Sequence, residues 1–298
     1  MLPDDRAAAP QQRLLDWYDL HRRALPWRTD PTPYAVLVSE LMLQQTQVDR
    51  VIPYFERFVS RFPTFRALAG AARAEVIRLW SGLGYNRRAV HLHETARIVV
   101  ERHGGHLPAD RDALQALPGV GRYTAGAIMS IAFGLKEPAP DTNVRRVIGR
   151  FLAANSEAQT AVDAATTALV PAERAGDWNQ ALMDLGSAVC LSRKPRCLIC
   201  PLLSACKSAG RVQPARRKRE PSIEVFAGSS RFYRGRFLAA LAAVPDGTVA
   251  PLTSVADRLA NLGVAEPRPG WNAIAESLAR DGLARIEPLA DGLGVGLA

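Results

Sequence analysis

Long apolar runs are missing from this 298-residue sequence, and cysteine is confined to one short stretch. No apolar run approaches the roughly 20 residues that cross a bilayer, so we expect no transmembrane helix. Residues 1–10 contain Asp4 and Asp5 and no apolar segment of a signal peptide. We therefore expect no secretory signal, and the cytoplasm is the expected compartment. These absences argue against an exported or membrane-embedded protein.

Lysine is absent beyond residue 220, and the charge is unevenly distributed. The net charge is +9; residues 1–220 hold 31 basic and 21 acidic residues, whereas residues 221–298 hold 7 arginines and 8 acids. A basic region followed by a near-neutral one indicates a polyanionic partner such as a nucleic acid. Charge alone leaves two other interpretations open, a surface kept soluble by its charge and attraction to anionic lipid.

The four cysteines are Cys190, Cys197, Cys200 and Cys206. A disulfide framework usually spreads its cysteines along the chain, so this clustering indicates a metal site. Four thiolates in one loop can hold an iron–sulfur cluster. The Cys-x-x-Cys step also suits zinc, and spacing alone leaves zinc open.

The patterning predicts a mainly α fold. The first 210 residues read as successive helices with no strand-like alternation, including one over 142–152 and a stretch over 34–58 broken near Pro53. Residues 211–221 form a basic linker. Residues 222–298 predict a small α(+β) module, with three helices and a hairpin that would suit a winged helix.

A glycine-rich turn, Leu117-Pro118-Gly119-Val120-Gly121, separates two predicted helices. Gly119 and Gly121 allow conformations that other residues resist, and they expose the amides of the following helix start. Such a helix N-terminus can bind a phosphate, to which Arg122 adds charge. An ordinary tight turn between helices is the alternative.

Two acidic residues are candidates for acid–base chemistry because of their positions in the predicted helices. Glu40 lies inside an otherwise apolar helix, which would raise its pKa and suit a general acid, unless it lies on the solvated face. Asp141 precedes a predicted helix, where an aspartate commonly caps the N-terminus and stays ionised.

These motifs together resemble the helix-hairpin-helix DNA glycosylases of the endonuclease III superfamily. The resemblance covers roughly residues 11–210 and rests on the 117–121 turn, Asp141 and the cysteines. The strings Ser39-Glu40-Leu41-Met42-Leu43-Gln44-Gln45-Thr46-Gln47-Val48 and Trp178-Asn179-Gln180-Ala181-Leu182-Met183-Asp184-Leu185-Gly186 are similar to the adenine-mismatch (MutY-type) branch. The resemblance implies a two-lobed fold, with a six-helix lobe over about 32–140 and a cluster lobe made of the N-terminal helix and 141–210.

The resemblance also implies an activity, base excision from mismatched duplex DNA by a monomeric repair enzyme carrying one [4Fe-4S] cluster on the four cysteines. It implies that Glu40 protonates the adenine and that Asp141 stabilises the cationic sugar. Asn143 would position Asp141 or water. Tyr123 stands where bifunctional relatives carry a Schiff-base lysine, so we expect a monofunctional enzyme, with Tyr123 against the sugar.

Further residues are implied to extrude and hold the base. Gln45 would plug the duplex and Tyr85 would be a second wedge. The remaining implied residues are Gln44 and Thr46 beside the plug, Trp27, Arg28, Leu43 and Gln180 in the base pocket, and Arg87 and Arg88 on phosphates.

The C-terminal region departs from the resemblance. MutY-type enzymes typically carry a NUDIX-like β domain that recognises 8-oxoguanine, and residues 222–298 do not resemble it. The resemblance implies adenine opposite 8-oxoguanine or guanine as the substrate. Without the NUDIX-like domain, a strict requirement for 8-oxoguanine opposite the adenine is not implied. Two alternatives remain: a thymine- or uracil-mismatch glycosylase of the same superfamily, and a non-catalytic iron–sulfur DNA-binding protein.

Overall fold

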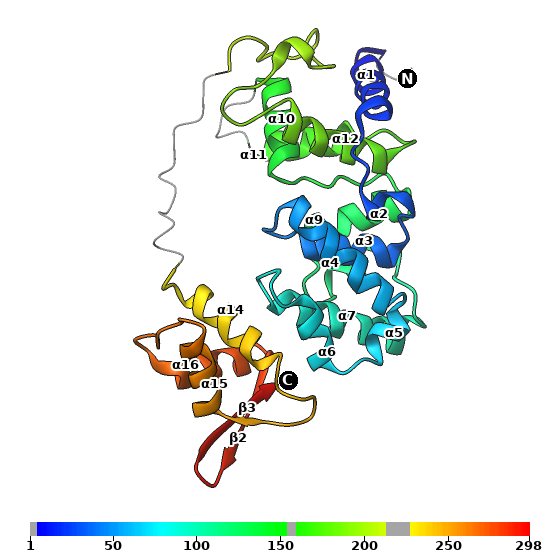
Figure 1. Cartoon of the computed structure of the whole chain (residues 1–298). Coiled ribbons are helices and arrows are strands. Elements are labelled where there is room, and N and C mark those ends of the chain that lie inside the picture. The colour runs from blue at the N-terminus through cyan, green and yellow to red at the C-terminus, as the bar shows by residue number, and fades with distance from the viewer. Residues whose placement is uncertain (1–4, 154–158, 213–226) are drawn as a thin grey trace. The chain divides into compact units, whose positions relative to one another are not determined.

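The computed structural model describes residues 5–153, 159–212 and 227–298. The chain is mainly helical (Figure 1), and its described elements divide into two compact units. The elements are α1 (Asp5–His21), α2 (Pro26–Thr29), α3 (Pro33–Leu43), α4 (Val48–Arg61), α5 (Phe65–Ala69), α6 (Arg73–Trp80), α7 (Arg87–His103), α8 (Arg111–Gln115), α9 (Arg122–Ala127), the π-helix η1 (Ile128–Ala132), α10 (Thr142–Leu152), α11 (Gln159–Ala168), α12 (Ala175–Ala188), the 3-10 helix η2 (Cys197–Ile199), α14 (Ser230–Leu241), β1 (Ala250–Pro251), α15 (Leu252–Asn261), α16 (Gly270–Arg280), β2 (Ala284–Leu289) and β3 (Gly292–Leu297).

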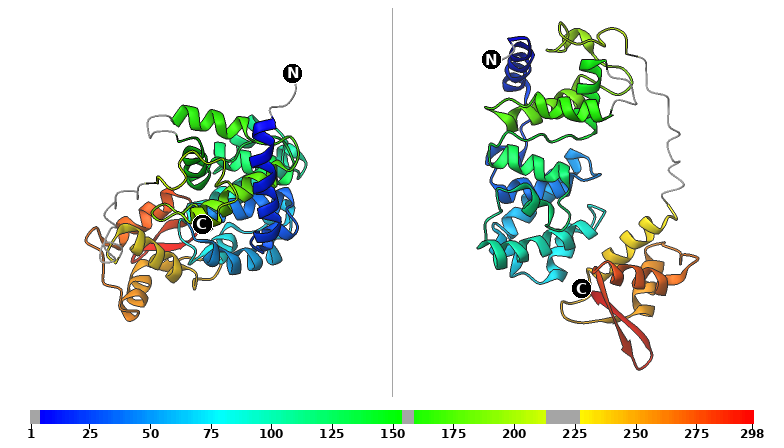
Figure 2. Two further views of the ribbon diagram at one scale, coloured as in Figure 1. Left: turned by 90° about the horizontal axis from the view of Figure 1, so that it is seen from above. Right: turned by 180° about the vertical axis from the view of Figure 1, so that it is seen from behind.

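The first unit comprises residues 1–40 and 107–217, and its core joins both ends of that sequence. Leu14 and Tyr18 of α1 pack with Val144 of α10 and with Trp178 and Leu182 of α12. Figures 1 and 2 show α1 beside α12 from both sides. This packing fixes the start of α10, where the candidate carboxylate Asp141 lies.

The second unit comprises residues 41–106 and 218–298. Its C-terminal part follows the order helix, strand, two helices and two strands, and the antiparallel sheet has the order β1-β3-β2. This is the topology of a winged helix, in agreement with the sequence. Figures 1 and 2 show the β2–β3 hairpin projecting from the helices.

The winged-helix module shares a core with the helical part of its unit. Phe237 and Leu241 of α14 belong to the same buried cluster as Ile77 of α6 and Val90 of α7. Arg78 adds polar contacts, because it donates hydrogen bonds to the Ala242 carbonyl and the Asp246 carboxylate at 2.8–3.0 Å. The module is therefore packed onto α6 and α7.

Two details of the sequence analysis need correction. The break expected near Pro53 falls at residues 44–47 instead, where Gln45 has a left-handed backbone. Pro53 lies on the exposed side of α4, so the carbonyl that its ring deprives of a partner is near water. The compact units also cut across the expected lobes, because residues 107–140 group with the cluster region.

None of the described helices is both long and apolar enough to cross a membrane.

Candidate active site

Glu40 is a buried acid on α3. The helix has apolar residues on all sides, so Glu40 is only 7% exposed. Burial raises its pKa from 4.5 to about 7; a hydrogen bond from Tyr123 lowers the pKa, the nearby Asp141 raises it and Arg28 lowers it. The alternative of a solvated glutamate is therefore wrong. At neutral pH a large share of Glu40 carries a proton that it can donate.

Tyr123, at the start of α9, interacts with both acids. Its hydroxyl contacts the Glu40 carboxyl and lies 3.8 Å from the Met183 sulfur. Burial, followed by the charges of Glu40 and Asp141, raises the pKa of Tyr123 well above its usual value. The phenol therefore stays a hydrogen-bond donor.

Asp141 caps α10, as the sequence predicted. One carboxylate oxygen accepts a hydrogen bond from the Val144 amide at 2.6 Å, and the other accepts one from the Asn143 side chain at 3.0 Å. These two bonds fix the orientation of the Asp141 carboxyl group. The structure thus brings Glu40, Tyr123, Asp141 and Asn143 together in one unit, with an acid and a carboxylate in different environments.

A chain of hydrogen bonds links Asp141 to the cysteine loop. Arg146 donates to the side-chain Oδ1 of Asn143 at 2.8 Å and to the backbone carbonyls of Gly186 at 2.7 Å and Cys190 at 3.0 Å. Gly186 makes this contact possible, because a Cβ there would lie 2.6 Å from the Asn143 Cβ. The loop therefore helps to hold the Asn143 side chain against Asp141.

Arg28, expected in the base pocket, is held by an acid that sequence reasoning missed. Asp184 of α12 is 2% exposed and accepts hydrogen bonds from Arg28 at 2.7 and 3.2 Å and from Arg23 at 2.8 Å. An acid in the apolar string Ala181-Leu182-Met183-Asp184-Leu185 is the same signal that pointed to Glu40. That signal could have identified it.

The four cysteines line one small pocket. All are half-buried free thiols, and burial raises the pKa of Cys200 and Cys206. Arg150 lies beside them and donates to the Leu191 and Ser192 carbonyls at 2.7 Å. Within the described residues, no group of Cys, His, Asp or Glu is gathered tightly enough around one point for a single metal ion.

Arg88 does not lie on a phosphate-binding surface, which corrects the expectation for it. It is only 6% exposed, and burial lowers its pKa to about 10. Its guanidinium donates hydrogen bonds of 2.6–3.1 Å to the carbonyls of Leu41, Met42, Gln44, Gly84 and Tyr85 and to the Thr46 hydroxyl. Because every donor is aimed at protein oxygens, Arg88 joins the turn after α3 to the loop before α7.

Those two turns carry the two expected wedges. Gln45 is exposed and has φ 58°, and Tyr85 is half-buried with φ 48°. A left-handed backbone is uncommon for residues other than glycine and is strained. Arg88 holds both turns in this conformation through the carbonyls around them.

The remaining expected residues lie as follows. Gly119 has φ 78°, as the glycine-rich turn implied, but Gly121 is extended at φ −92°, so its conformation does not require glycine. A Cβ at Gly121 would meet no protein atom, and Arg122 is exposed. Trp27 is buried, Arg87 is exposed, and Leu43, Gln44, Thr46 and Gln180 are half-buried.

Comparison with known proteins identifies the family. Residues 38–172 match the model of the HhH-GPD superfamily of base excision DNA repair proteins. The "Adenine DNA glycosylase" of Mycolicibacterium smegmatis is 42% identical over 285 residues, which cover 94% of this chain and 93% of that protein. The enzyme of the same name from Mus musculus is 46% identical over 217 residues, 68% of this chain and 42% of that protein. The chain thus spans under half the length of this mammalian relative.

A solved structure described as a thermostable thymine-DNA glycosylase superposes with a TM-score of 0.64. It is 31% identical and covers 70% of this chain and 98% of its own. The fold is that of the helix-hairpin-helix class. The chain belongs to the HhH-GPD superfamily, and among its relatives are proteins named adenine DNA glycosylase.

The burial of Glu40 predicts an unusual effect on stability. The folded pKa of about 7 lies above the ordinary 4.5, so the folded protein loses stability as pH rises from about 4.5 through 7. Glu40→Gln cannot ionise, and we expect it to be more stable than wild type by on the order of 1–3 kcal/mol at pH 8 and equal near pH 4.5. Urea unfolding at both pH values measures this. The exposed control Glu56→Gln should show no such difference; equal stability of Glu40→Gln and wild type at pH 8 would show that the acid is not desolvated.

The Arg88 contacts predict a large cost for a substitution that keeps the charge. Lysine cannot reproduce the planar set of donors, so Arg88→Lys should lower the free energy of unfolding by at least about 2 kcal/mol. Arg87→Lys, one residue earlier and 64% exposed in its side chain, should change it by less than about 0.5 kcal/mol. Urea titrations of both variants make the comparison, and similar values for the two would contradict the structural role of Arg88.

Proposed function

We propose that this protein is a monofunctional DNA glycosylase of base excision repair that removes adenine mispaired with 8-oxoguanine or guanine. The observation that carries the proposal is the buried Glu40, with its pKa near 7, close to the hydrogen-bonded carboxylate Asp141. Acid catalysis of base release needs a proton donor for the base and a negative charge for the sugar. The site supplies both at neutral pH.

The residues suggest a sequence of steps. Glu40 transfers its proton to a ring nitrogen of the adenine, and the N-glycosidic bond breaks with its electron pair leaving on the base. The ionised Asp141 stabilises the positive charge on the sugar. Water then adds to C1′ and gives a proton to the Glu40 carboxylate, which restores the acid. Tyr123 cannot form an imine with the sugar, so the product is an abasic site.

Base extrusion is assigned to the two strained turns. The exposed Gln45 would fill the gap in the duplex, and Tyr85 would unstack the neighbouring step. Open space beside Gly121 supports close approach of a DNA backbone to the 117–121 turn, because neither conformation nor packing requires glycine there. Arg122 and Arg87 would contact phosphates of the mismatched duplex, on which the protein acts as a monomer.

Adenine is favoured over thymine for two reasons. The relatives that cover most of this chain are named for adenine, and Leu43-Gln44-Gln45-Thr46-Gln47 is similar to the adenine branch. Together with Trp27, Arg28 and Gln180, Leu43 would shape the base pocket. The similarity to a thymine-DNA glycosylase structure makes removal of thymine opposite guanine the second candidate.

We also propose one [4Fe-4S] cluster held by Cys190, Cys197, Cys200 and Cys206. The donors fit, because all four thiols line one pocket and cysteine thiolates are the usual ligands of such clusters. The cluster would supply structural cohesion to a loop whose Arg193, Lys194, Arg196 and Lys207 can reach phosphates.

The cluster makes a spectroscopic prediction. Purified protein should be brown, with charge-transfer absorbance near ~400 nm and about four iron atoms per chain. Cys200→Ser should lose most of this absorbance, whereas Ser192→Cys, outside the four positions, should retain it. Colourless protein that contains zinc after anaerobic purification would contradict the assignment.

A mismatch panel tests the reaction. Duplexes with A opposite 8-oxoguanine, A opposite G, and T opposite G are incubated with protein and then cleaved with alkali. We expect cleavage at adenine only after alkali, a rate that falls as pH rises above about 7, and a loss of at least about 10²-fold in Glu40→Gln.

Each other outcome selects a different interpretation. Cleavage at T selects the second candidate, and cleavage without alkali contradicts the monofunctional assignment. Tight binding of duplex with no base release would indicate a non-catalytic iron–sulfur DNA-binding protein.

A further inference from the structure

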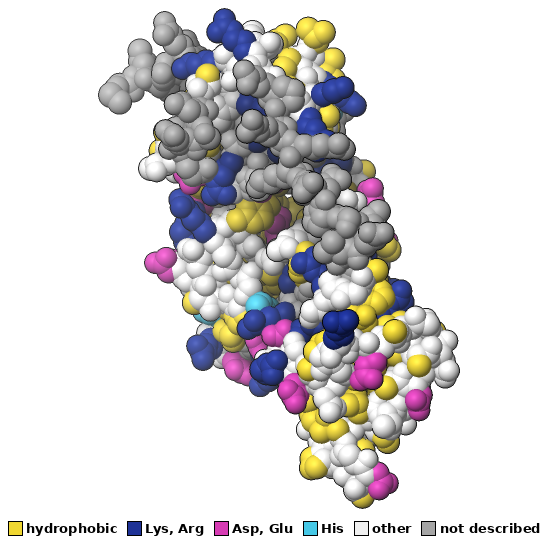
Figure 3. Space-filling model, turned by 90° about the vertical axis from the view of Figure 1, so that its left-hand side faces the viewer, with side chains coloured by type: hydrophobic (Ala, Val, Ile, Leu, Met, Phe, Trp, Pro, Cys, Tyr) yellow, Lys and Arg dark blue, Asp and Glu magenta, His cyan; other side chains and the backbone are white. Residues whose placement is uncertain are grey.

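The winged-helix module presents little positive charge on the elements that usually read DNA. In a helix-turn-helix the second helix enters the major groove, which here is α16. Its exposed ionisable residues are Glu276 and Arg280, which lie 3.9 Å apart as an ion pair. The hairpin turn carries Asp291, and Figure 3 shows acidic and hydrophobic side chains, with no Lys or Arg, at the lower tip of the molecule.

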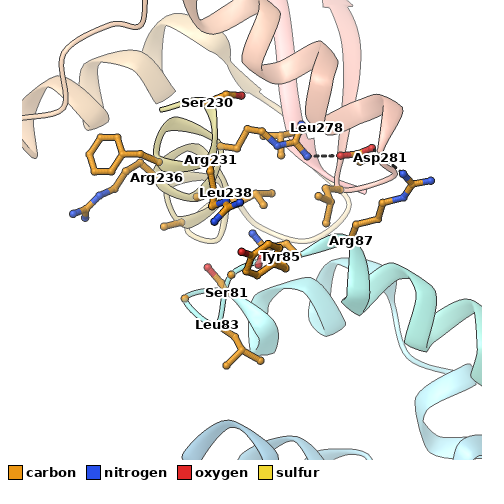
Figure 4. Close-up of a pocket in the computed structure, with 18 of the residues that line it drawn as sticks. Ser81, Leu83, Tyr85, Arg87, Ser230, Arg231, Arg236, Leu238, Leu278 and Asp281 are labelled. Atoms are coloured by element: carbon orange, nitrogen blue, oxygen red, sulfur yellow. Dashed lines mark hydrogen bonds and ion pairs between the residues drawn. The ribbon is translucent and has the colours of Figure 1, made fainter. Parts of the chain in front are cut away.

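The arginines of the module gather instead on its first helix, α14. Arg231 and Arg236 are exposed, and Arg234 is half-buried. Together with Arg50 and Arg87 they line a cavity of about 900 Å³. Figure 4 shows this cavity between α14 and the loop that carries Tyr85.

The cavity has an excess of positive charge. Its lining contains five arginines and one carboxylate, Asp281, which pairs with Arg234 and lies 3.8 Å from Arg87. Arg231 stacks on the Tyr85 ring at 4.6 Å, and Arg236 lies 5.4 Å from the Phe232 ring. Among the described residues, no carboxylate is paired with Arg231 or Arg236, so both can bind an anion.

The position of a glycine inside α14 is a second, independent observation that points to a ligand. Gly235 lies inside the helix, where glycine is unfavourable relative to alanine. Its backbone φ is not positive, and a Cβ added there would meet no atom within 4 Å. Neither backbone nor packing requires glycine, yet Gly235 lines the basic cavity. Close approach of an external group to the helix would explain it.

We infer that α14, not α16 or the hairpin, is the DNA-binding element of the module, and that its arginines hold the phosphodiester backbone beside the Tyr85 wedge. Phosphates are the partner that fits, because the cavity is cationic and adjoins the residue assigned to unstack a base step. The inference rests on the proposed DNA substrate but not on which base is removed.

Binding of a short undamaged duplex tests the inference without base release. The double variant Arg231→Ala, Arg236→Ala should bind on the order of ten-fold more weakly at physiological salt, and the slope of log K against log salt should fall by about two. The matched control Arg268→Ala, Arg280→Ala removes two exposed arginines of the same module. It should leave both quantities close to wild type, and equal losses in the two variants would overturn the inference.

Two more variants separate binding from folding. Arg231→Lys, Arg236→Lys keeps the charges and should retain most of the slope. Gly235→Ala should raise the Tm by about 1–3 °C, since alanine favours the helix, and yet weaken duplex binding. A more stable Gly235→Ala protein with unchanged affinity would contradict close approach of DNA to α14.

The outcome is separable from that of the mismatch panel. Protein that binds duplex through α14 but releases no base would contradict the proposed function and leave this inference intact. If the protein releases adenine but the alanine double variant keeps the wild-type affinity and slope, the proposed function is supported and this inference is contradicted.

Discussion

The rest of the site depends on the desolvation of one carboxyl group, that of Glu40. An acid among apolar side chains is costly to ionise, so Glu40 stays substantially protonated near pH 7. Nearby Arg28 would oppose this state, because its positive charge favours the carboxylate. Asp184 accepts two hydrogen bonds from Arg28 and another from Arg23, and it therefore offsets the field that Arg28 exerts on Glu40. Two buried acids thus have different neighbours: Glu40 lies among apolar side chains, whereas Asp184 is paired with two arginines.

The second requirement is a carboxylate held in a fixed orientation close to that acid. Asp141 meets it through backbone geometry, since a helix N-terminus supplies the Val144 amide and a partial positive charge. Its orientation then depends on Asn143, on Arg146 and finally on the Cys190 carbonyl. This path explains how the proposed cluster, far from Asp141 in sequence, could influence the orientation of that carboxylate. A loop that loosens around Cys190 would release Arg146, and Asn143 would lose a partner.

The sequence alone was enough to predict helices, strands and residue roles that depend only on residues close by in the sequence. The helix over 142–152 and its Asp141 cap agree with the structure residue for residue. The three helices and the hairpin of residues 227–298 were predicted, whereas the two-residue strand β1 was not. Prediction failed for residues whose hydrogen-bond partners lie far away in the sequence. Arg88 was predicted to contact a phosphate, because nothing close to it in the sequence shows that oxygens of residues 42–47 positions earlier surround it. Asp184 was passed over because its partners Arg23 and Arg28 lie more than 150 residues away.

Arg88 also explains why the wedges are built on strained turns. A plug that entered the duplex from a flexible loop would lose conformational freedom on binding, and that loss would weaken binding. Gln45 and Tyr85 are already held in left-handed conformations that a free chain seldom adopts, so little ordering remains to be done. Glycine would relieve the strain but would remove the side chain that is proposed to enter the base stack. The strain is therefore stabilised from outside, by one buried guanidinium whose donors all point at the backbone and side-chain oxygens of the two turns. A buried cation serves this purpose better than packing alone, because carbonyl directions, and with them the turn conformations, are fixed by hydrogen bonds.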